Sequence, residues 1–180
     1  MTTPAVQVRP PHDEADLEAV RALMRGFVAW HRSRHEQDRH LVEANFDDAA
    51  FDRELAELHL KYVPPEGGLL LARLDGAPVG CVALRRIDKH TCEMKRLFVR
   101  PEAQHRGVGR ALARAIIALA VDAGYSTMVL DTSVRQREAA ALYRGLGFTD
   151  VPAYYDVPEP LANWLVFMRL ELAATPARTC

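Results

Sequence analysis

The sequence predicts an α/β fold of the α+β kind, with one mixed, mostly antiparallel central sheet and helices on both of its faces. Two observations support this prediction. Segments with apolar residues at helical spacing alternate with short segments rich in β-favouring residues. An Asp75-Gly76 turn also joins two neighbouring strands directly, as in an antiparallel hairpin.

The first half of the chain predicts a strand, two helices and a hairpin. Val6–Arg9 is extended, and Pro10-Pro11 end this strand before Asp13 caps the first helix. A second helix continues until Pro64-Pro65. Strands at residues 69–74 and 79–87 then flank a turn at residues 75–78. The apolar faces of the two helices consist of Leu17, Val20, Met24, Phe27 and His31, and of Phe51, Leu55, Leu58 and Tyr62.

The second half predicts the centre of the sheet and the helices that pack on it. Residues 92–99 form a central strand, and residues 107–123 form the most regular amphipathic helix, which Gly124 ends. A buried strand at residues 128–132 precedes a helix at residues 137–146, which Gly147 closes. After a proline-bearing loop at residues 152–160, the last strand covers residues 164–172. The predicted order is β-α-α-β-β-β-α-β-α-β-β.

Length and composition favour one soluble domain. The chain has 180 residues, of which 49% are apolar and 26% charged, so we expect one domain over residues 1–172 and a polar tail at residues 173–180. A formal charge of -1 argues against nucleic-acid and membrane partners. No signal peptide or membrane-spanning stretch is visible. Cys81, Cys92 and Cys180 form no CxxC pair, which argues against disulfides and zinc and favours a reducing cytoplasm.

The turn at residues 104–109 (Gln-His-Arg-Gly-Val-Gly) predicts an anion site. It lies between a strand and the most regular helix, whose first amides lack helical partners and carry a partial positive charge. Gly107 and Gly109 lack the Cβ atoms that would hold a phosphate away, and Arg106 can add a charged donor. A Walker loop and a dinucleotide fingerprint are excluded, because the Lys-Ser/Thr pair and the third glycine are absent. Alternatively, the glycines only make a tight strand-to-helix connection.

Three motifs in order give this chain a resemblance to the GNAT superfamily of acyl-CoA-dependent N-acetyltransferases. Residues 104–109 match the family's Q/R-x-x-G-x-G/A turn, residues 93–99 (Glu-Met-Lys-Arg-Leu-Phe-Val) resemble the strand before it, and Ala139 to Tyr143 with Gly147-Phe148 resemble its "A-x-x-L-Y…GF" helix. The resemblance covers nearly the whole chain and implies a GNAT-like fold that binds acetyl-CoA. One departure is Gln136, where many members have Asn; the amide is retained.

The resemblance also implies where the cosubstrate binds. Its pantetheine arm would follow the strand near Phe98 and Val99, with the Val99 N–H as donor to the oxyanion, and its diphosphate would bind the turn before the helix. The residues that it assigns to acetyl-CoA are Leu97, Phe98, Val99, Gln104, His105, Arg106, Gly107, Val108, Gly109, Arg110, Gln136, Ala139 and Tyr143.

Acyl transfer to an amine requires a neutral nucleophile and a proton for the departing thiolate. The resemblance implies that Tyr143 protonates the thiolate; alternatively, Tyr143 is a core residue. It also implies that Glu93, eleven residues before Gln104, is the general base, directly or through water. The alternative for Glu93 is exposure to solvent or an ion pair with Lys95 or Arg96.

Other candidates have ordinary structural explanations beside the functional ones. His31 and His35 have a spacing that suits a metal, but no third ligand is evident, so we expect a solvated basic helix end and no metal site. Residues 25–52 and 154–164 lie where GNAT relatives form the acceptor pocket. The aromatic residues there either line that pocket or belong to the core: Trp30, Tyr154, Tyr155 and Trp164.

The sequence therefore predicts a cytoplasmic N-acetyltransferase that moves an acetyl group from acetyl-CoA directly to a primary amine in a ternary complex. The acceptor is a small molecule or peptide that the sequence does not identify, and a homodimer is possible. One alternative is a non-catalytic acyl-CoA-binding regulatory module. Another is a nucleotide-phosphate-binding domain, which ATP or NAD would protect from melting where coenzyme A would not.

Overall fold

The computed structural model describes residues 6–34 and 36–172, and within these residues seven strands form one sheet with the order β1-β2-β3-β4-β5-β7-β6. Only β4 and β5 pair in parallel, so the sheet is mixed and mostly antiparallel, as predicted. The predicted tail at residues 173–180 lies outside the described residues. The strands are β1 (Val6–Arg9), β2 (Gly68–Leu74), β3 (Ala77–Arg86), β4 (Thr91–Val99), β5 (Thr127–Ser133), β6 (Thr149–Val151) and β7 (Leu165–Glu171).

Helices cover both faces of the sheet, because successive residues of its strands point to opposite sides. On β2, for example, Leu69 and Leu71 belong to the core beneath α1, whereas Leu70 and Ala72 belong to the core beneath α5. The helices are α1 (Glu14–Arg34), α2 (Arg39–Asn45), α3 (Asp48–Ala56), α4 (Leu58–Lys61), α5 (Val108–Asp122) and α6 (Arg137–Arg144), with short 3-10 turns η1 (Glu36–Asp38), η2 (Pro101–Ala103) and η3 (Glu159–Leu161).

The second predicted helix is wrong in extent. Glu57 ends α3, where its N–H donates to the carbonyls of both Arg53 and Glu54, and α4 begins at Leu58. The turn brings the Tyr62 hydroxyl to Glu54 Oε1 at 2.7 Å. Helix α2 was not predicted, because only Val42 of its residues is buried and its sequence therefore shows no apolar stripe.

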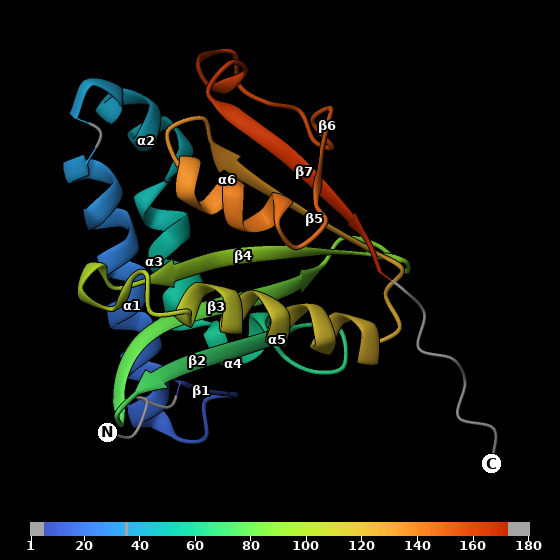
Figure 1. The fold of residues 1–180 in the computed structure, drawn as a ribbon. Coiled ribbons are helices and arrows are strands. Elements are labelled where there is room, and N and C mark those ends of the chain that lie inside the picture. The colour runs from blue at the N-terminus through green and yellow to red at the C-terminus, as the bar shows by residue number, and fades with distance from the viewer. Residues whose placement is uncertain (1–5, 35, 173–180) are drawn as a thin grey trace.

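Strands β4 and β5 separate shortly after they begin to pair. Their parallel register covers Thr91↔Thr127, Cys92↔Met128 and Glu93↔Val129 only. Beyond these pairs, β4 stays on β3 and β5 stays on β7, so the two strands diverge toward their carboxyl ends (Figure 1). This opening in the middle of the sheet positions the candidate site.

Candidate active site

A cavity of about 380 Å³ lies at the diverging end of β4, between the start of α5 and the start of α6. Its lining includes every residue predicted to bind acetyl-CoA except Arg106, Val108 and Tyr143. Phe27, Trp30 and Arg34 of α1 also line it, together with Glu138 and Leu142 of α6. The structure thus brings together, around one cavity, most of the residues that the separate sequence motifs predict to bind acetyl-CoA. The predicted lining residues are Leu97, Phe98, Val99, Gln104, His105, Gly107, Gly109, Arg110, Gln136 and Ala139.

The turn before α5 has the geometry of an anion site. Gly107 caps the helix with a φ of 82°, and the helical hydrogen bonds begin with Ala111 N–H donating to Gly107 O at 3.0 Å. The amides of Val108, Gly109 and Arg110 therefore precede the first helical bond and lie where α5 carries partial positive charge. A Cβ atom at Gly107 would meet nothing within 4 Å, so the turn is open rather than filled by side chains.

Two predicted cofactor residues point elsewhere. Val108 is buried in the core beneath α5, so only its backbone faces the turn. The Arg106 guanidinium forms a long ion pair with Asp75, at 4.0 Å. It would have to leave Asp75 to add charge at the turn. Gln104 supports the turn from within, because its side-chain amide donates to Val99 O at 3.2 Å.

A bulge in β4, which no pattern in the sequence predicted, shapes the opening. The register shifts opposite Cys81 and Ala83, and Arg96 adopts a φ of 58°, which is unusual for a residue with a side chain. The Arg96 guanidinium donates twice to buried Glu54, at 2.9 Å each. This ion pair holds the bulge that presents Leu97 to the opening.

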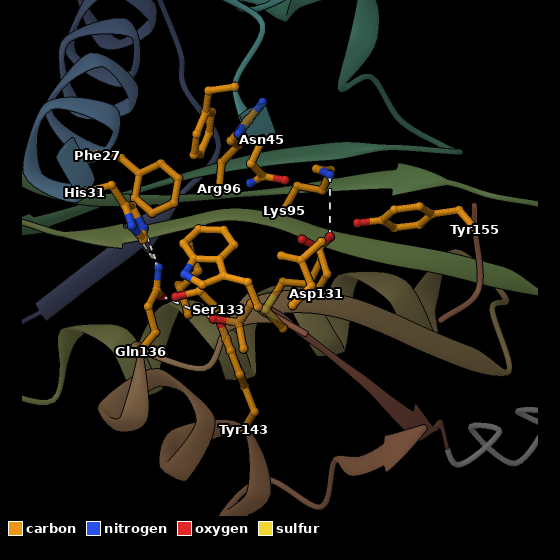
Figure 2. Close-up of a pocket in the computed structure, with 16 residues that line it drawn as sticks. Phe27, His31, Asn45, Lys95, Arg96, Asp131, Ser133, Gln136, Tyr143 and Tyr155 are labelled. Carbon is orange, nitrogen blue, oxygen red and sulfur yellow. Dashed lines mark hydrogen bonds and ion pairs between the residues drawn. The ribbon is translucent and has the colours of Figure 1, made fainter. Parts of the chain in front are cut away.

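A second cavity of about 260 Å³ lies between the diverging strands. Phe27, Leu97 and Gln136 line both cavities, so the two adjoin. Figure 2 shows Lys95 of β4 facing Asp131 of β5 across this space. The remaining lining comes from α1, the end of α2, the bulge of β4, β5, α6 and the segment before β7: His31, Asn45, Phe46, Met94, Arg96, Thr132, Ser133, Tyr143, Tyr155, Trp164 and Leu165.

Tyr143 is buried and lines the second cavity from α6. Burial raises the pKa of its phenol, and the charge of Asp131 raises it further. The hydroxyl is therefore protonated at neutral pH and can act as a proton donor. Tyr143 also packs on Phe148, with ring centroids 5.8 Å apart, as the core interpretation expects; its role as proton donor stays a prediction.

Glu93 is fully buried and lines neither of these cavities. Its carboxylate forms an ion pair with Arg85, lies 3.6 Å from Lys95 Nζ and accepts a 2.6 Å hydrogen bond from the Tyr154 hydroxyl. Burial, and then the charge of Glu93, raise the pKa of Tyr154. An ion pair with Lys95 was among the alternatives from sequence; the described partners of Glu93 do not include Arg96.

Comparison with known proteins decides the family. The model of the acetyltransferase (GNAT) family matches residues 21–148. The chain belongs to the GNAT family. Membership confirms the predicted fold, the acyltransferase class and acetyl-CoA as the cosubstrate.

GNAT relatives match this chain in sequence and in structure. An uncharacterized N-acetyltransferase of Schizosaccharomyces pombe is 43% identical over 68% of this chain and 74% of its own length. The N-acetylaspartate synthetase of Danio rerio is 34% identical over 66% of this chain, but the match spans only 43% of that protein. The N-acetyltransferase PaiA of Thermoplasma acidophilum, in complex with coenzyme A, has a TM-score of 0.66 at 17% identity and covers 93% of this chain and 99% of its own.

Several polar residues that line the second cavity were not predicted as site residues from the sequence. His31 was expected at a solvated helix end, but it is 2% exposed and forms a hydrogen bond with the Gln136 amide, which also accepts from Thr132 Oγ1 at 3.3 Å. His35, whose spacing from His31 was weighed as a metal pair and set aside, lies outside the described residues. Asp131 and Ser133 were not singled out, because alternate residues of a buried strand carry no motif. Their place in the opening becomes visible only once β5 separates from β4.

The aromatic candidates divide between the two cavities. Trp30 lines the cavity at the start of α5, Trp164 and Tyr155 line the second cavity, and Tyr154 contacts Glu93. Within the described part of the chain, no group of three or more His, Cys, Asp or Glu side chains could hold a metal ion. Among the same residues, no helix is both long enough and apolar enough to span a bilayer.

Proposed function

We propose that this GNAT enzyme is an N-acetyltransferase that transfers the acetyl group of acetyl-CoA directly to a primary amine held in the second cavity. The observation that carries the proposal is the junction of the two cavities at Leu97 and Gln136. One cavity begins at the open amino-terminal end of α5, which suits a diphosphate, and the other contains the buried phenol of Tyr143 and the partly buried carboxyl group of Asp131. The thioester and the amine would meet at the junction.

The fit to acetyl-CoA rests on the chain's own backbone. In this proposal the amides before the first helical bond of α5 bind the diphosphate, and Gln104, His105 and Arg110 flank it. The pantetheine arm lies along Leu97 to Val99, where β4 has left β5. The Val99 N–H donates to the oxyanion, which requires no particular side chain. Gln136 and Ala139 close the opposite side.

Tyr143 supplies the proton that the departing thiolate needs, because its raised pKa keeps the hydroxyl protonated until sulfur charge develops. The amine must lose a proton before it attacks. For an amine with a pKa near 10.4, neutralisation at pH 7 costs about 4–5 kcal/mol, whereas an α-amine near 8 costs about 1 kcal/mol. Glu93 was the predicted base. Because it is buried behind Lys95, it acts on an amine in this proposal only through neighbouring groups.

We propose a small amine as the acceptor. The second cavity, at about 260 Å³, has room for a compact molecule, and its lining carries both charges. The name of the Danio rerio relative, a synthetase of N-acetylaspartate, supports an amino-acid-like acceptor. A reducing cytoplasm is part of the proposal, since Cys81 and Cys92 are free, buried thiols.

An amine-panel screen tests the proposal. The protein is mixed with acetyl-CoA and L-aspartate, spermidine, glycinamide, or peptides with a free α-amine or lysine. Thiol release gives the rate, and mass spectrometry identifies any product 42 Da heavier, the mass an acetyl group adds. Acetylation of at least one amine above the no-enzyme rate is expected. Protection from melting by acetyl-CoA without any acetylated amine would instead support the non-catalytic acyl-CoA-binding module.

A further inference from the structure

Strand β5 places two polar side chains in the opening that the sequence did not single out. Asp131 and Ser133 are two residues apart, so both point to the side of the sheet that faces α1 and α2. Both line the second cavity, and Figure 2 shows them below Lys95 of the opposite strand.

The Asp131 carboxyl is held in the cavity without a close partner of opposite charge. Its side chain is 16% exposed, and its ion pair with Lys95 Nζ, at 3.9 Å, is too long for a hydrogen bond. Burial raises the pKa of Asp131, and the positive charge of Lys95 offsets only part of that effect. A carboxyl group in this position gains more from a cation in the cavity than a solvated one would.

Ser133 points independently to a ligand. It is 4% exposed, and its hydroxyl has no hydrogen-bond partner among the described residues. A buried polar atom without a partner is unfavourable, and such atoms are rare in folded proteins. A polar molecule in the cavity that Ser133 lines would supply the partner.

Glu93 differs from Asp131 in burial, in its partners and in its position relative to the cavity. Its carboxylate is fully buried outside the cavity and has three partners: Arg85, Lys95 and Tyr154. Lys95 lies between the two carboxylates, 3.6 Å from Glu93 and 3.9 Å from Asp131. Glu93 therefore positions the ammonium group of Lys95 rather than contacting the cavity.

We propose that Asp131 binds the ammonium group of the acceptor and takes its proton, that Ser133 makes a second hydrogen bond to the acceptor, and that Glu93 is a positioning residue acting through Lys95. This inference rests on the proposed function, and it assigns the contact between enzyme and acceptor to β5 rather than to β4.

The proposed step balances in atoms and charge. An N–H bond of the ammonium group breaks, and an O–H bond forms on Asp131. The neutral nitrogen then bonds to the thioester carbonyl carbon, and the C–S bond breaks with its electron pair on sulfur. Tyr143 protonates that sulfur, and the second proton of the attacking nitrogen returns to the Tyr143 oxygen. The proton on Asp131 passes to solvent, so each turnover releases one proton.

Proton transfer to Asp131 is easier from an α-amine with a pKa near 8 than from an alkylamine near 10.4. Several charged or titratable groups on the surrounding elements influence Asp131. These groups are Lys95, Glu93 and Arg96 of β4, Arg85 of β3, Tyr143 of α6, and Tyr154 and Tyr155 of the segment after β6.

The kinetic test uses glycinamide as the probe acceptor. It has an α-amine, and its carboxyl end is an uncharged amide. Asp131→Asn should lower kcat/KM at least 100-fold and remove the acidic limb of its pH profile, while the affinity for acetyl-CoA changes less than twofold. Glu93→Gln should move that limb without removing it. Ser133→Ala should raise KM about fivefold with little change in kcat. The matched control is Asp122→Asn, at the exposed end of α5, which should behave as wild type.

Turnover of Asp131→Asn within threefold of wild type would overturn the inference and leave the proposed function intact. If the wild type acetylates no amine, the proposed function fails, and a binding experiment still decides the role of Asp131. Protein labelled with ¹³C at aspartate carboxyl groups is saturated with coenzyme A and titrated with glycinamide at pH 6. The Asp131 signal, assigned from Asp131→Asn, should shift saturably, and more weakly in Ser133→Ala; an unchanged signal overturns the inference.

Discussion

Replacing Glu54 with glutamine should destabilise the protein by about 3.5 kcal/mol at pH 7. Glu54 is 6% exposed and accepts hydrogen bonds from Arg96 and Tyr62. Burial by itself raises the pKa of Glu54, but these contacts outweigh it and lower the pKa from 4.5 to about 2. A pKa difference of about 2.5, at roughly 1.4 kcal/mol for each unit of pKa, gives about 3.5 kcal/mol. Removing one partner of a buried ion pair costs about 3–5 kcal/mol, which agrees.

The size of this effect should depend on pH in a defined direction. Because folding lowers the pKa of Glu54, its contribution is complete above the unfolded value near 4.5 and declines as the pH falls toward 2. About 1 kcal/mol should be left at pH 3. Glu54→Gln has no carboxyl group to protonate, so the difference between the two proteins should narrow over this range.

Urea unfolding followed by circular dichroism at pH 7, 5 and 3, at constant ionic strength, measures both quantities. Glu57→Gln, an exposed carboxylate three residues away, is the matched control and should change stability by less than about 0.5 kcal/mol. A Glu54→Gln difference below 1 kcal/mol at pH 7 would refute the reasoning, as would one that stays constant down to pH 3. The variant should also bind acetyl-CoA more weakly, because the ion pair holds the bulge beside Leu97.

Three further outcomes are expected. Tyr143→Phe should lower kcat about 10²–10³-fold with little change in acetyl-CoA affinity, measured by thiol release and calorimetry; an unchanged kcat removes Tyr143 from the chemistry. Gly109→Val should weaken acetyl-CoA binding at least about tenfold in calorimetry, because a Cβ there already lies 3.5 Å from Leu142 and the added methyl groups would enter the cavity; wild-type affinity would contradict this. Burial raises the pKa of Cys81 and Cys92 to about 12, so iodoacetamide at pH 8 should label them only after unfolding, and native labelling seen by peptide mass spectrometry would contradict their burial.

Local patterns predicted most of the fold. The apolar stripe and the flanking glycines located α5, and Asp75-Gly76 located the hairpin, where both residues have positive φ. Helix α2 was not predicted, because Val42 is its only buried residue and its sequence shows no apolar stripe. The break at Glu57 was not predicted, because the buried faces of α3 and α4 follow one continuous apolar pattern. A pattern of apolar spacing reports which side of a helix is buried, not where the helix is interrupted.

In the candidate site, too, local features were predictable and features that depend on tertiary packing were not. Residues near the turn at Gly107 were predictable, because backbone geometry and motif coincide there. The bulge at Arg96 was not, since its partner Glu54 is 42 residues away in the sequence. Asp131 and Ser133 line a cavity only because β5 separates from β4. This separation depends on tertiary packing and has no local signature in the sequence.

The divergence of β4 and β5 leaves two strand edges inside the sheet whose peptide groups do not pair with each other beyond Glu93 and Val129. Such edges are an aggregation hazard when they are solvent-exposed, and the pantetheine arm in the proposed complex would cover them. Binding to the folded state alone stabilises it by about 2.7 kcal/mol when the free ligand is 100 times its Kd. Bound acetyl-CoA should therefore lower the fraction of unfolded chains that a protease can cut, as well as supply the acetyl group.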